Sequence, residues 1–476
     1  MKSSGWLVST SLAGCHLLLA LPAAGATIVV PSGIMATIQD GIDAARSGDT
    51  VIVADGTYPG GINFNRKLIT VRSENGPQNC IIDGGDDTRG VTFSHGENSY
   101  ARLDGFTIRN CRSPKGGGIH LESRSSPTIA NCIIKDNNTS YSGAGINCYN
   151  SSPTIINCSI SGNLAWGDGG SISCKNNSFP TITNCTIFWN TSAAKGGGIY
   201  ALNSSPAIAG CSIWGNAAYG GGGGIHCHNS SPAITGCTIS GNSGPSAGGI
   251  HCYNSSPAIT TCTISQNEAA YQAGGIYCSD NSSPTITVCT ISGNSRKYPF
   301  NDPYNFNAGG GIGLQGSSPV IANCIIWGNS TDKGGSGIFV ADGSFPMIVN
   351  CTVVGNGSAD NQGGGVWSAD AVPTILNSIL WNNSPPEIYV HNSVFWPKRE
   401  PIVSYSDIEG GYQGTANINA DPLFVNAAAG DFHIQPGSPC IDSASNGADM
   451  GAYEAVGSPA LSSGFLLDPS DPQYIP

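Results

Sequence analysis

The chain has 476 residues, of which 66 are glycine and only 11% are charged, and its formal net charge is −12. This acidic balance excludes the basic surface that nucleic-acid binding needs, so we expect no nucleic-acid partner. The length would suffice for two or three ordinary domains, but a solenoid can be longer because each coil contacts only its neighbours.

Residues 1–26 have the pattern of a signal peptide. Lys2 supplies a positive charge, an apolar stretch runs from Trp6 to Leu21, and Ala24-Gly25-Ala26 has the small-x-small form of a cleavage site. We therefore expect a secreted or cell-surface protein that is cleaved near Ala26.

Lipidation is the alternative at this end of the chain. Leu12-Ala13-Gly14-Cys15 resembles a lipobox, but Cys15 lies in the middle of the apolar run, which favours simple cleavage. After this run no stretch is long and apolar enough to span a membrane, so we expect no transmembrane segment.

Residues 27–112 are expected to form an N-terminal cap and the first coils of a solenoid. Residues 37–45 are the best helix candidate, because Ile38, Ile42 and Ala45 fall on one face. A strand that ends in a turn follows at 48–58. The two segments resemble the N-terminal cap and first coil of the pectin-lyase-like superfamily.

Residues 113–383 are regular repeats of about 26 residues. One unit reads GGIHCHNSSPAITGCTISGN (223–242) and the next GGIHCYNSSPAITTCTISQN (248–267). Each unit contains three short β-type runs (Gly-Gly-Ile-x-Cys, Pro-x-Ile and Cys-x-Ile), which predict one coil of a parallel β-helix with coils stacked about 4.8 Å apart. A marker cysteine recurs at Cys132, Cys158, Cys185, Cys211, Cys237, Cys262, Cys289, Cys324 and Cys351, and Ser378 takes its place in the last unit.

Alternation along a strand assigns the columns of side chains. Ile225 and Cys227 are expected to point inward, and His226 and His228 outward. The inward cysteines then serve as small core residues, with disulfides between coils as the alternative. A second column lies five residues after each marker position and is expected to form an asparagine ladder. Its members are Asn137, Asn163, Asn190, Asn216, Asn242, Asn267, Asn294, Asn329, Asn356 and Asn383.

Residues 384–457 are expected to supply the C-terminal coils and cap, followed by a polar tail at 458–476. The segments at 420–424, 437–442 and 449–454 resemble the closing segment of bacterial extracellular right-handed β-helix repeat proteins, and the repeats also resemble those of chlamydial polymorphic outer-membrane proteins. The resemblance implies an all-β fold, namely a right-handed single-stranded parallel β-helix with a short N-terminal capping helix.

The pectin-lyase-like superfamily contains polysaccharide lyases and hydrolases, so catalysis has to be considered. A lyase needs a base together with an arginine or a cation. Charged residues are sparse in the repeats and concentrated in the first coils. The catalytic candidates there are Arg102, Asp104, His95 and Arg109, and the metal candidates are Asp83, Asp86 and Asp87. Ca²⁺ is the cofactor that we would consider for a lyase, and we expect none otherwise.

Two outward rows are candidates for ligand binding, because tyrosine, tryptophan and histidine rings can stack on sugars. One row follows Gly-Gly-Ile and contains Tyr149, Tyr200, His226, His228, His251, Tyr253 and Tyr277. The other lies in the variable loops and contains Tyr141, Trp166, Tyr219, Tyr271 and Tyr298. The alternatives are ordinary outward strand residues and, for His226, His228 and His251, a metal site.

These patterns favour non-catalytic binding of an extracellular polysaccharide or surface glycan. The first alternative is a pectate-lyase-like lyase or a hydrolase that acts on a uronate-containing polysaccharide. The second alternative is a structural spacer at the cell surface.

Overall fold

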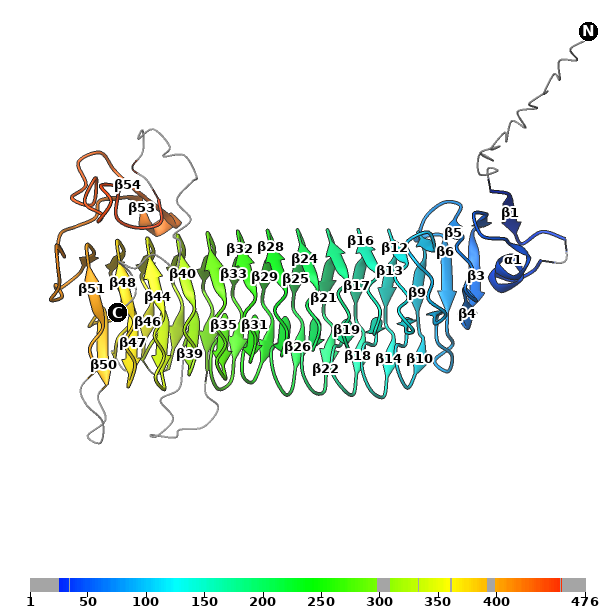
Figure 1. Cartoon of the computed structure of the whole chain (residues 1–476), viewed down its shortest axis with the longest axis horizontal. Coiled ribbons are helices and arrows are strands. Elements are labelled where there is room, and N and C mark those ends of the chain that lie inside the picture. Colours follow the sequence, from blue (N-terminus) through cyan, green and yellow to red (C-terminus); the bar gives the residue numbers. More distant parts are fainter. Residues whose placement is uncertain are drawn as a thin grey trace, which may run out of the picture.

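The computed structural model describes residues 25–33, 35–297, 309–332, 334–359, 362–391, 399–453 and 455. Most of the expected signal peptide including Cys15, the candidate Tyr298 and the polar tail lie outside these ranges. The described residues form a long solenoid of stacked coils, with the strand at residues 27–30 at one end of the stack and the strand at residues 402–404 near the other (Figure 1). The predicted right-handed parallel β-helix is confirmed.

Each coil contributes one strand to each of several parallel sheets, which we number in the order in which a coil passes through them. Sheet 1 has 13 described strands: β4 (Ile62–Asn63), β7 (Val91–Phe93), β11 (Ile119–Leu121), β15 (Ile146–Tyr149), β19 (Ile172–Lys175), β23 (Ile199–Leu202), β27 (Ile225–His228), β31 (Ile250–Tyr253), β35 (Ile276–Ser279), β39 (Ile312–Gln315), β43 (Ile338–Ala341), β47 (Val366–Ala369) and β50 (Ile388–His391).

Sheet 2 follows the proline of each repeat. Its 15 described strands are β1 (Thr27–Val30), β2 (Thr50–Val53), β5 (Thr70–Ser73), β8 (Arg102–Asp104), β12 (Thr128–Ala130), β16 (Thr154–Ile156), β20 (Thr181–Thr183), β24 (Ala207–Ala209), β28 (Ala233–Thr235), β32 (Ala258–Thr260), β36 (Thr285–Thr287), β40 (Val320–Ala322), β44 (Met347–Val349), β48 (Thr374–Leu376) and β51 (Ile402–Ser404).

Sheet 3 follows the marker cysteine. Its 14 described strands are β3 (Gly56–Pro59), β6 (Cys80–Asp83), β9 (Thr107–Arg109), β13 (Ile133–Lys135), β17 (Ser159–Ser161), β21 (Thr186–Phe188), β25 (Ser212–Trp214), β29 (Thr238–Ser240), β33 (Thr263–Ser265), β37 (Thr290–Ser292), β41 (Ile325–Trp327), β45 (Thr352–Val354), β49 (Ile379–Trp381) and β52 (Asp407–Ile408).

A fourth sheet of two-residue strands follows the asparagine ladder. Its ten described strands are β10 (Arg112–Ser113), β14 (Asn138–Thr139), β18 (Leu164–Ala165), β22 (Thr191–Ser192), β26 (Ala217–Ala218), β30 (Ser243–Gly244), β34 (Glu268–Ala269), β38 (Ser295–Arg296), β42 (Ser330–Thr331) and β46 (Gly357–Ser358). The expectation of three strands per coil is therefore wrong. A strand of two residues is too short to show an alternating pattern in the sequence. These strands form because stacking of the coils brings their backbones within hydrogen-bonding distance.

The registers place equivalent residues of successive coils side by side. Ile225 pairs with Ile250, and Cys227 pairs with Cys252. These side chains point into the solenoid and are fully buried, as the alternation predicts. All cysteines except Cys15 are described, and all of these are buried free thiols, so the core interpretation of the cysteine columns holds in this structure.

The asparagine ladder is also confirmed. The Oδ1 atom of Asn242 accepts hydrogen bonds from the backbone N–H and Nδ2 of Asn216, at 3.0 and 2.9 Å. Its Nδ2 donates to the carbonyl of Ile213 and to Oδ1 of Asn267, at 2.9 and 3.0 Å. Because the amide supplies both donors and acceptors, each asparagine connects its coil to both neighbouring coils.

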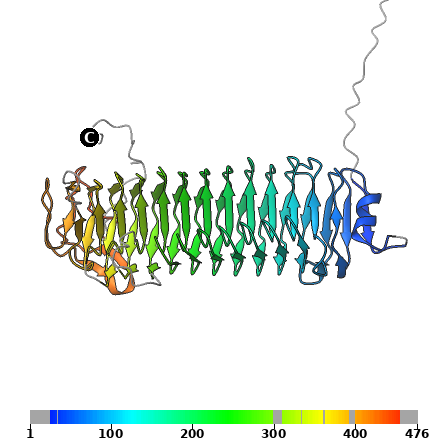
Figure 2. The same cartoon turned by 90° about the horizontal axis from the view of Figure 1, so that it is seen from below.

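The two ends of the stack carry different additions (Figures 1 and 2). The helix α1 (Ile38–Ala44) lies at the N-terminal end, where Thr37 and Asp40 form a capping box. At the other end an antiparallel hairpin of β53 (Phe424–Asn426) and β54 (Asp431–Ile434), joined by the 3-10 turn η1 (Ala427–Ala429), packs Phe432 on the outer face of sheet 3. Among the described residues, no helix is long and apolar enough to cross a membrane.

Candidate functional site

The catalytic candidates of the first coils lie on three different sheets. Arg102 and Asp104 pair with each other on β8 of sheet 2, with Nη2 and Oδ2 2.7 Å apart. Arg109 lies on β9 of sheet 3, and its Nε donates to Asp83 at 2.8 Å. His95 follows β7 of sheet 1 and donates its backbone N–H to Glu97. These contacts are local pairs, so the structure does not bring the candidates together as one site.

The metal candidates are also not gathered around one point. Both oxygens of Asp83 face hydrogen-bond donors, namely Arg109, Asn110 and the backbone of Gly85. Asp86 and Asp87 lie in an exposed turn after β6. In the part of the chain that the structure describes, no three histidine, cysteine or carboxylate side chains are grouped to hold a metal ion.

The first outward column of sheet 1 departs from expectation, because its side chains are buried although they point away from the core. Its members are His120, Asn147, Ser173, Tyr200, His226, His251 and Tyr277, each at most 7% exposed. The prediction that this column faces solvent is wrong. Tyr200, His226 and His251 are therefore not available to a ligand in this conformation, and Tyr277 is reached only through the pocket described below.

Glycine-rich loops before the sheet 1 strands cover this column. A Cβ atom at Gly221 would lie 2.6 Å from Nδ1 of His226, and one at Gly222 would lie 3.1 Å from Cβ of His251. Only glycine lets the loop backbone approach so closely. Loop alanines complete the cover, since Ala247 and Ala273 pack on Tyr277. The sequence shows the glycines but not the direction in which the loops fold.

The covered histidines are held in the neutral form. Burial lowers the pKa of His251 to about 3 and the pKa of His226 well below its ordinary value. Their rings lie edge to face, with centroids 4.6 Å apart, between Tyr200 and Tyr277. No described group hydrogen-bonds to Nε2 of His226 or to either ring nitrogen of His251. The metal-site alternative for His226, His228 and His251 is not met by the arrangement of these described residues.

The second outward column of sheet 1 remains accessible except at Ser279, which is buried, and we call this column the edge strip. Pairing of the strands aligns its members, which are Tyr149, Lys175, Leu202, His228, Tyr253 and Ser279. Tyr149 is 40% and Tyr253 37% exposed. The ring of His228 lies 4.8 Å from that of Tyr253, between centroids. The strip therefore presents rings and polar groups from successive coils along one edge of sheet 1.

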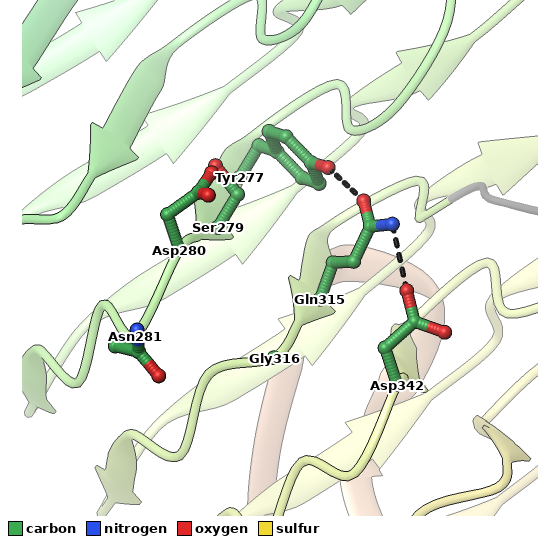
Figure 3. A pocket seen from close by; sticks show the side chains of 7 residues that line it. All are labelled: Tyr277, Ser279, Asp280, Asn281, Gln315, Gly316 and Asp342. Carbon is green, nitrogen blue, oxygen red and sulfur yellow. Dashed lines mark hydrogen bonds between the residues drawn. The ribbon is translucent and has the colours of Figure 1, made fainter.

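A polar pocket continues the edge strip. Its volume is about 400 Å³, and its lining comprises Tyr277, Ser279, Asp280, Asn281, Gln315, Gly316 and Asp342. Figure 3 shows Gln315 between Tyr277 and Asp342. The hydroxyl of Tyr277 donates to Oε1 of Gln315, and Nε2 of Gln315 donates to Asp342 at 2.7 Å. This chain fixes the Gln315 amide, while Asp280 and Asp342 are exposed on the two coils that flank it.

Sequence reasoning did not select the pocket residues Asp280, Gln315 and Asp342. The signal was present, because each of the three lies four residues before the proline of its repeat. The repeat with Asp280 differs in length from its neighbours. The sequence therefore did not show how closely the side chains of Asp280, Gln315 and Asp342 approach one another. Register alone does not predict the hydrogen-bonded chain from Tyr277 to Asp342.

The loop row is exposed where the structure describes it. Tyr141, Trp166, Tyr219 and Tyr271 are 61%, 65%, 75% and 36% exposed. They lie in the loops that cover the first outward column, so that column separates them from the edge strip. We retain them as candidate binding residues.

Comparisons with known proteins agree with this architecture. A family model of the right-handed β-helix region matches residues 32–168, 163–271 and 223–400. No curated protein matches the sequence. Among solved structures, a pectate lyase is 13% identical and aligns over 90% of this chain and 96% of its own, with a TM-score of 0.30.

Two further solved structures are similar at the same level. The catalytic domain of an α-1,3-glucanase, in complex with tetrasaccharides, is 13% identical over 83% of this chain and 70% of its own (TM-score 0.38). The receptor-binding domain of the siphovirus 9NA tailspike is 11% identical over 85% of this chain and 80% of its own (TM-score 0.36). At these identities and TM-scores, no activity is transferred to this chain.

Proposed function

The chain belongs to the family of right-handed β-helix region proteins, and from this premise we propose that it binds an extracellular polysaccharide without cleaving it. The ligand would lie along the edge strip and enter the polar pocket. The observation that carries the proposal is the accessible column from Tyr149 to Tyr253, which Ser279 connects to the pocket of Gln315 and the two aspartates. A linear column of binding groups suits an extended polymer.

The chemistry of the strip supports a sugar ligand. Tyrosine and histidine rings are apolar on their faces and can also form hydrogen bonds, which matches the two kinds of surface that a sugar presents. The carboxylates of Asp280 and Asp342 are acceptors for sugar hydroxyls. Because the strands of a solenoid are rigid, these groups are already in place before the ligand arrives, which lowers the entropic cost of binding.

We also propose that the protein works outside the cell after cleavage near Ala26. The support is the pattern of the first 26 residues. N-terminal sequencing of the protein recovered from the medium or the cell surface tests this proposal, and a mature chain that still begins at Met1 would contradict it.

Hydrolysis is the second candidate function, and the pair Asp280 and Asp342 favours it. The two residues lie on the coils before and after Gln315, so their backbones are about 10 Å apart at a coil spacing of about 4.8 Å. Inverting glycosidases hold two carboxyl groups about 6.5–9.5 Å apart. Side chains that lean toward each other across the pocket would meet this requirement.

One experiment separates the two candidates. The full chain is incubated with polygalacturonate, alginate, chondroitin and neutral glucans, and retention of the protein in affinity gels is measured beside new reducing ends and unsaturated products. We expect retention by at least one polymer and no product. Product that disappears in the double variant Asp280→Asn and Asp342→Asn would establish hydrolysis instead.

The residue test uses Tyr253→Ala. We expect the affinity for the retained polymer to fall about tenfold, since the variant removes one stacking ring worth about 1.4 kcal/mol. Tyr100→Ala is the matched control, because Tyr100 is 76% exposed in the turn between β7 and β8, on a coil that contributes no residue to the strip. Equal affinity of the wild type and the Tyr253→Ala variant would reject the edge strip as the binding surface.

A further inference from the structure

A tryptophan occupies a backbone position where most coils have glycine. The residue before each of the ten asparagines of the ladder has a left-handed backbone, with φ between 53° and 64°. Six of these ten residues are glycine, and Asp136, Gln266 and Asn382 are three of the others. The tenth is Trp189, with φ of 53°.

The conformation of Trp189 costs stability. A left-handed backbone is unfavourable for a residue with a Cβ atom by about 1–2 kcal/mol, and it is most unusual for a bulky side chain. The side chain of Trp189 is also 63% exposed, so little apolar burial offsets this cost. Strained residues of this kind are concentrated at functional sites.

The exposed indole belongs to an aromatic cluster on the outer face of sheet 3. Phe188 and Trp214, on the neighbouring strands β21 and β25, stack with centroids 4.8 Å apart and planes at 7°. Trp189 lies edge to face against both, at 5.3 and 5.1 Å. A Cβ atom at Gly215 would lie 2.7 Å from Cδ1 of Trp189, so Gly215 provides the space in which the indole lies.

The surroundings of the cluster are polar but uncharged. The outward residues of sheet 3 on the flanking coils are Ser161 on one side and Ser240 and Ser265 on the other. In sheet 3, the six described strands from β17 to β37 contain no charged residue. The cluster therefore offers ring faces and hydroxyl groups to a ligand, and no charge.

We propose that Phe188, Trp189 and Trp214 form a second binding site, which stacks on the pyranose rings of a neutral polysaccharide. The site lies on sheet 3, whereas the edge strip lies on sheet 1, so it does not depend on the function proposed for the strip. The cluster is too small for a stable contact with a second copy of the chain. Three aromatic side chains bury at most about 150–250 Å² each, and a stable interface needs about 800 Å² per partner.

The sequence carries a signal for this site. The repeat motif Ile-Ser-Gly-Asn becomes Ile-Phe-Trp-Asn at 187–190 and Ile-Trp-Gly-Asn at 213–216. The two changes fall on adjacent coils, and stacking of the coils brings the rings into contact. Only the structure shows that no other part of the described chain packs over Trp189.

The key variant is Trp189→Gly. Glycine occupies the same turn in six other coils, so this change removes the indole and relieves the backbone strain, and we expect the variant to fold at least as stably as the wild type. Gln266→Gly makes the same backbone change two or more coils away from the cluster and is the matched control. Trp214→Ser, with the serine found on the flanking coils, is a second test of the cluster.

Binding is measured on the full chain with cellohexaose, laminarihexaose and mannohexaose, by titration of the tryptophan fluorescence and by calorimetry. We expect at least one hexasaccharide to bind with an affinity that does not change with salt. Trp189→Gly and Trp214→Ser should each weaken this binding about tenfold or more, because each removes a stacking ring. Gln266→Gly and Tyr100→Ala should leave it unchanged.

Four results would overturn the proposal. The first is that none of the three hexasaccharides binds to the wild type. The second is that Trp189→Gly binds as tightly as the wild type. The third is that ultracentrifugation shows dimers of the wild type but monomers of Trp189→Gly, which would identify a second copy of the chain as the occupant. Loss of binding in Tyr253→Ala alone would support the edge strip and reject the sheet 3 site.

Discussion

Single side chains at fixed positions hold each coil to its neighbours. The asparagine ladder is the clearest case, because each amide is buried and its donors and acceptor face both adjacent coils. The marker cysteines act at another corner of the coil, where the backbone N–H of Cys211 donates to Sγ of Cys237 at 3.4 Å. Ser378 continues this column and accepts from the N–H of Cys351 at 3.1 Å, so a hydroxyl can replace the thiol there.

Asn242→Ala tests the ladder. Alanine leaves the backbone N–H and Nδ2 of Asn216 and the carbonyl of Ile213 without the partners that Asn242 provides. We expect the free energy of unfolding to fall by about 2–4 kcal/mol, since each buried group left unsatisfied costs about 1–3 kcal/mol. Denaturant unfolding followed by circular dichroism measures the loss.

Thr238→Ala is the control for this measurement. Thr238 lies in the same repeat but is exposed on the outer face of sheet 3. A change of less than about 0.5 kcal/mol is expected there. If both variants unfolded with the same free energy, the ladder would have no special role in stability.

A column of identical side chains that runs through many coils acts as one structural element, and its last member needs a different partner. The asparagine ladder ends at Glu387, whose carboxylate accepts hydrogen bonds from the backbone N–H and Nδ2 of Asn383. Burial, together with the charge of Glu409, raises the pKa of Glu387 to about 7, although the hydrogen bonds from Asn383 act to lower it. The last rung of the ladder therefore titrates near neutral pH.

This titration predicts a pH dependence of stability. Between the ordinary value of 4.5 and about 7, the folded chain holds a proton on Glu387 that the unfolded chain releases. The free energy of unfolding therefore falls as the pH rises through this window and is constant above it, with a total contribution of at most about 3 kcal/mol.

Glu387→Gln isolates this contribution. The amide oxygen of glutamine can accept from Asn383 as an asparagine of the ladder does, and it carries no titratable proton. We expect the variant to be more stable than the wild type at pH 8 and to lack the decrease between pH 4.5 and 7. The free energy of unfolding of both proteins is measured by denaturant unfolding at each pH. If the wild type and the variant showed the same dependence on pH, Glu387 would already be ionised across this range.

The glycine-rich loops are the elements that decide which residues can meet a ligand. They lie over the first outward column of sheet 1 and leave the edge strip open. As a result Tyr200, His226, His251 and Tyr277 pack against one another as an outer layer of the fold. Tyr149, His228 and Tyr253 remain at the surface.

At the scale of the whole molecule, the solenoid is a one-dimensional stack in which each coil contacts only the next. Stability then arises from interfaces between neighbours, together with the caps at the two ends. The helix with the capping box at Thr37 lies at one end, and the hairpin of β53 and β54 packs on the outer face of sheet 3 near the other end (Figure 1). The repeats between them are interchangeable in backbone structure.

Deletion of one complete repeat tests this modularity. Removing residues 238–262 joins Cys237 to Thr263, which restores the motif Cys-Thr-Ile-Ser and keeps every later coil in register. We expect a folded protein that unfolds cooperatively, because one coil interface is lost and the caps are unchanged. Circular dichroism and small-angle scattering should show the same fold with a length shorter by about 4.8 Å.

Deletion of half a repeat is the contrasting variant. Removing residues 238–250 would place a strand of sheet 1 where a strand of sheet 3 belongs and interrupt the asparagine ladder. We expect this protein to aggregate or to unfold at much lower denaturant concentration. Equal stability of the two deletion variants would contradict a stack held in register by its columns.

The sequence by itself determined the periodic features of this protein. The spacing of the marker cysteines and asparagines predicted the coil, the inward columns and the ladder, and the apolar face of residues 37–45 predicted the capping helix, which the structure has at Ile38–Ala44. These features depend on alternation along a strand and on stacking of identical units, and both repeat identically from coil to coil.

The tertiary structure alone decided what is accessible. Alternation showed that His226 and His251 point outward, but burial also depends on where the loops fold, and glycine allows a loop many directions. The pocket at Asp280, Gln315 and Asp342 and the cluster at Trp189 likewise depend on side chains from different coils that meet in space. Such contacts are set by packing between coils, which a repeat pattern along the chain does not record.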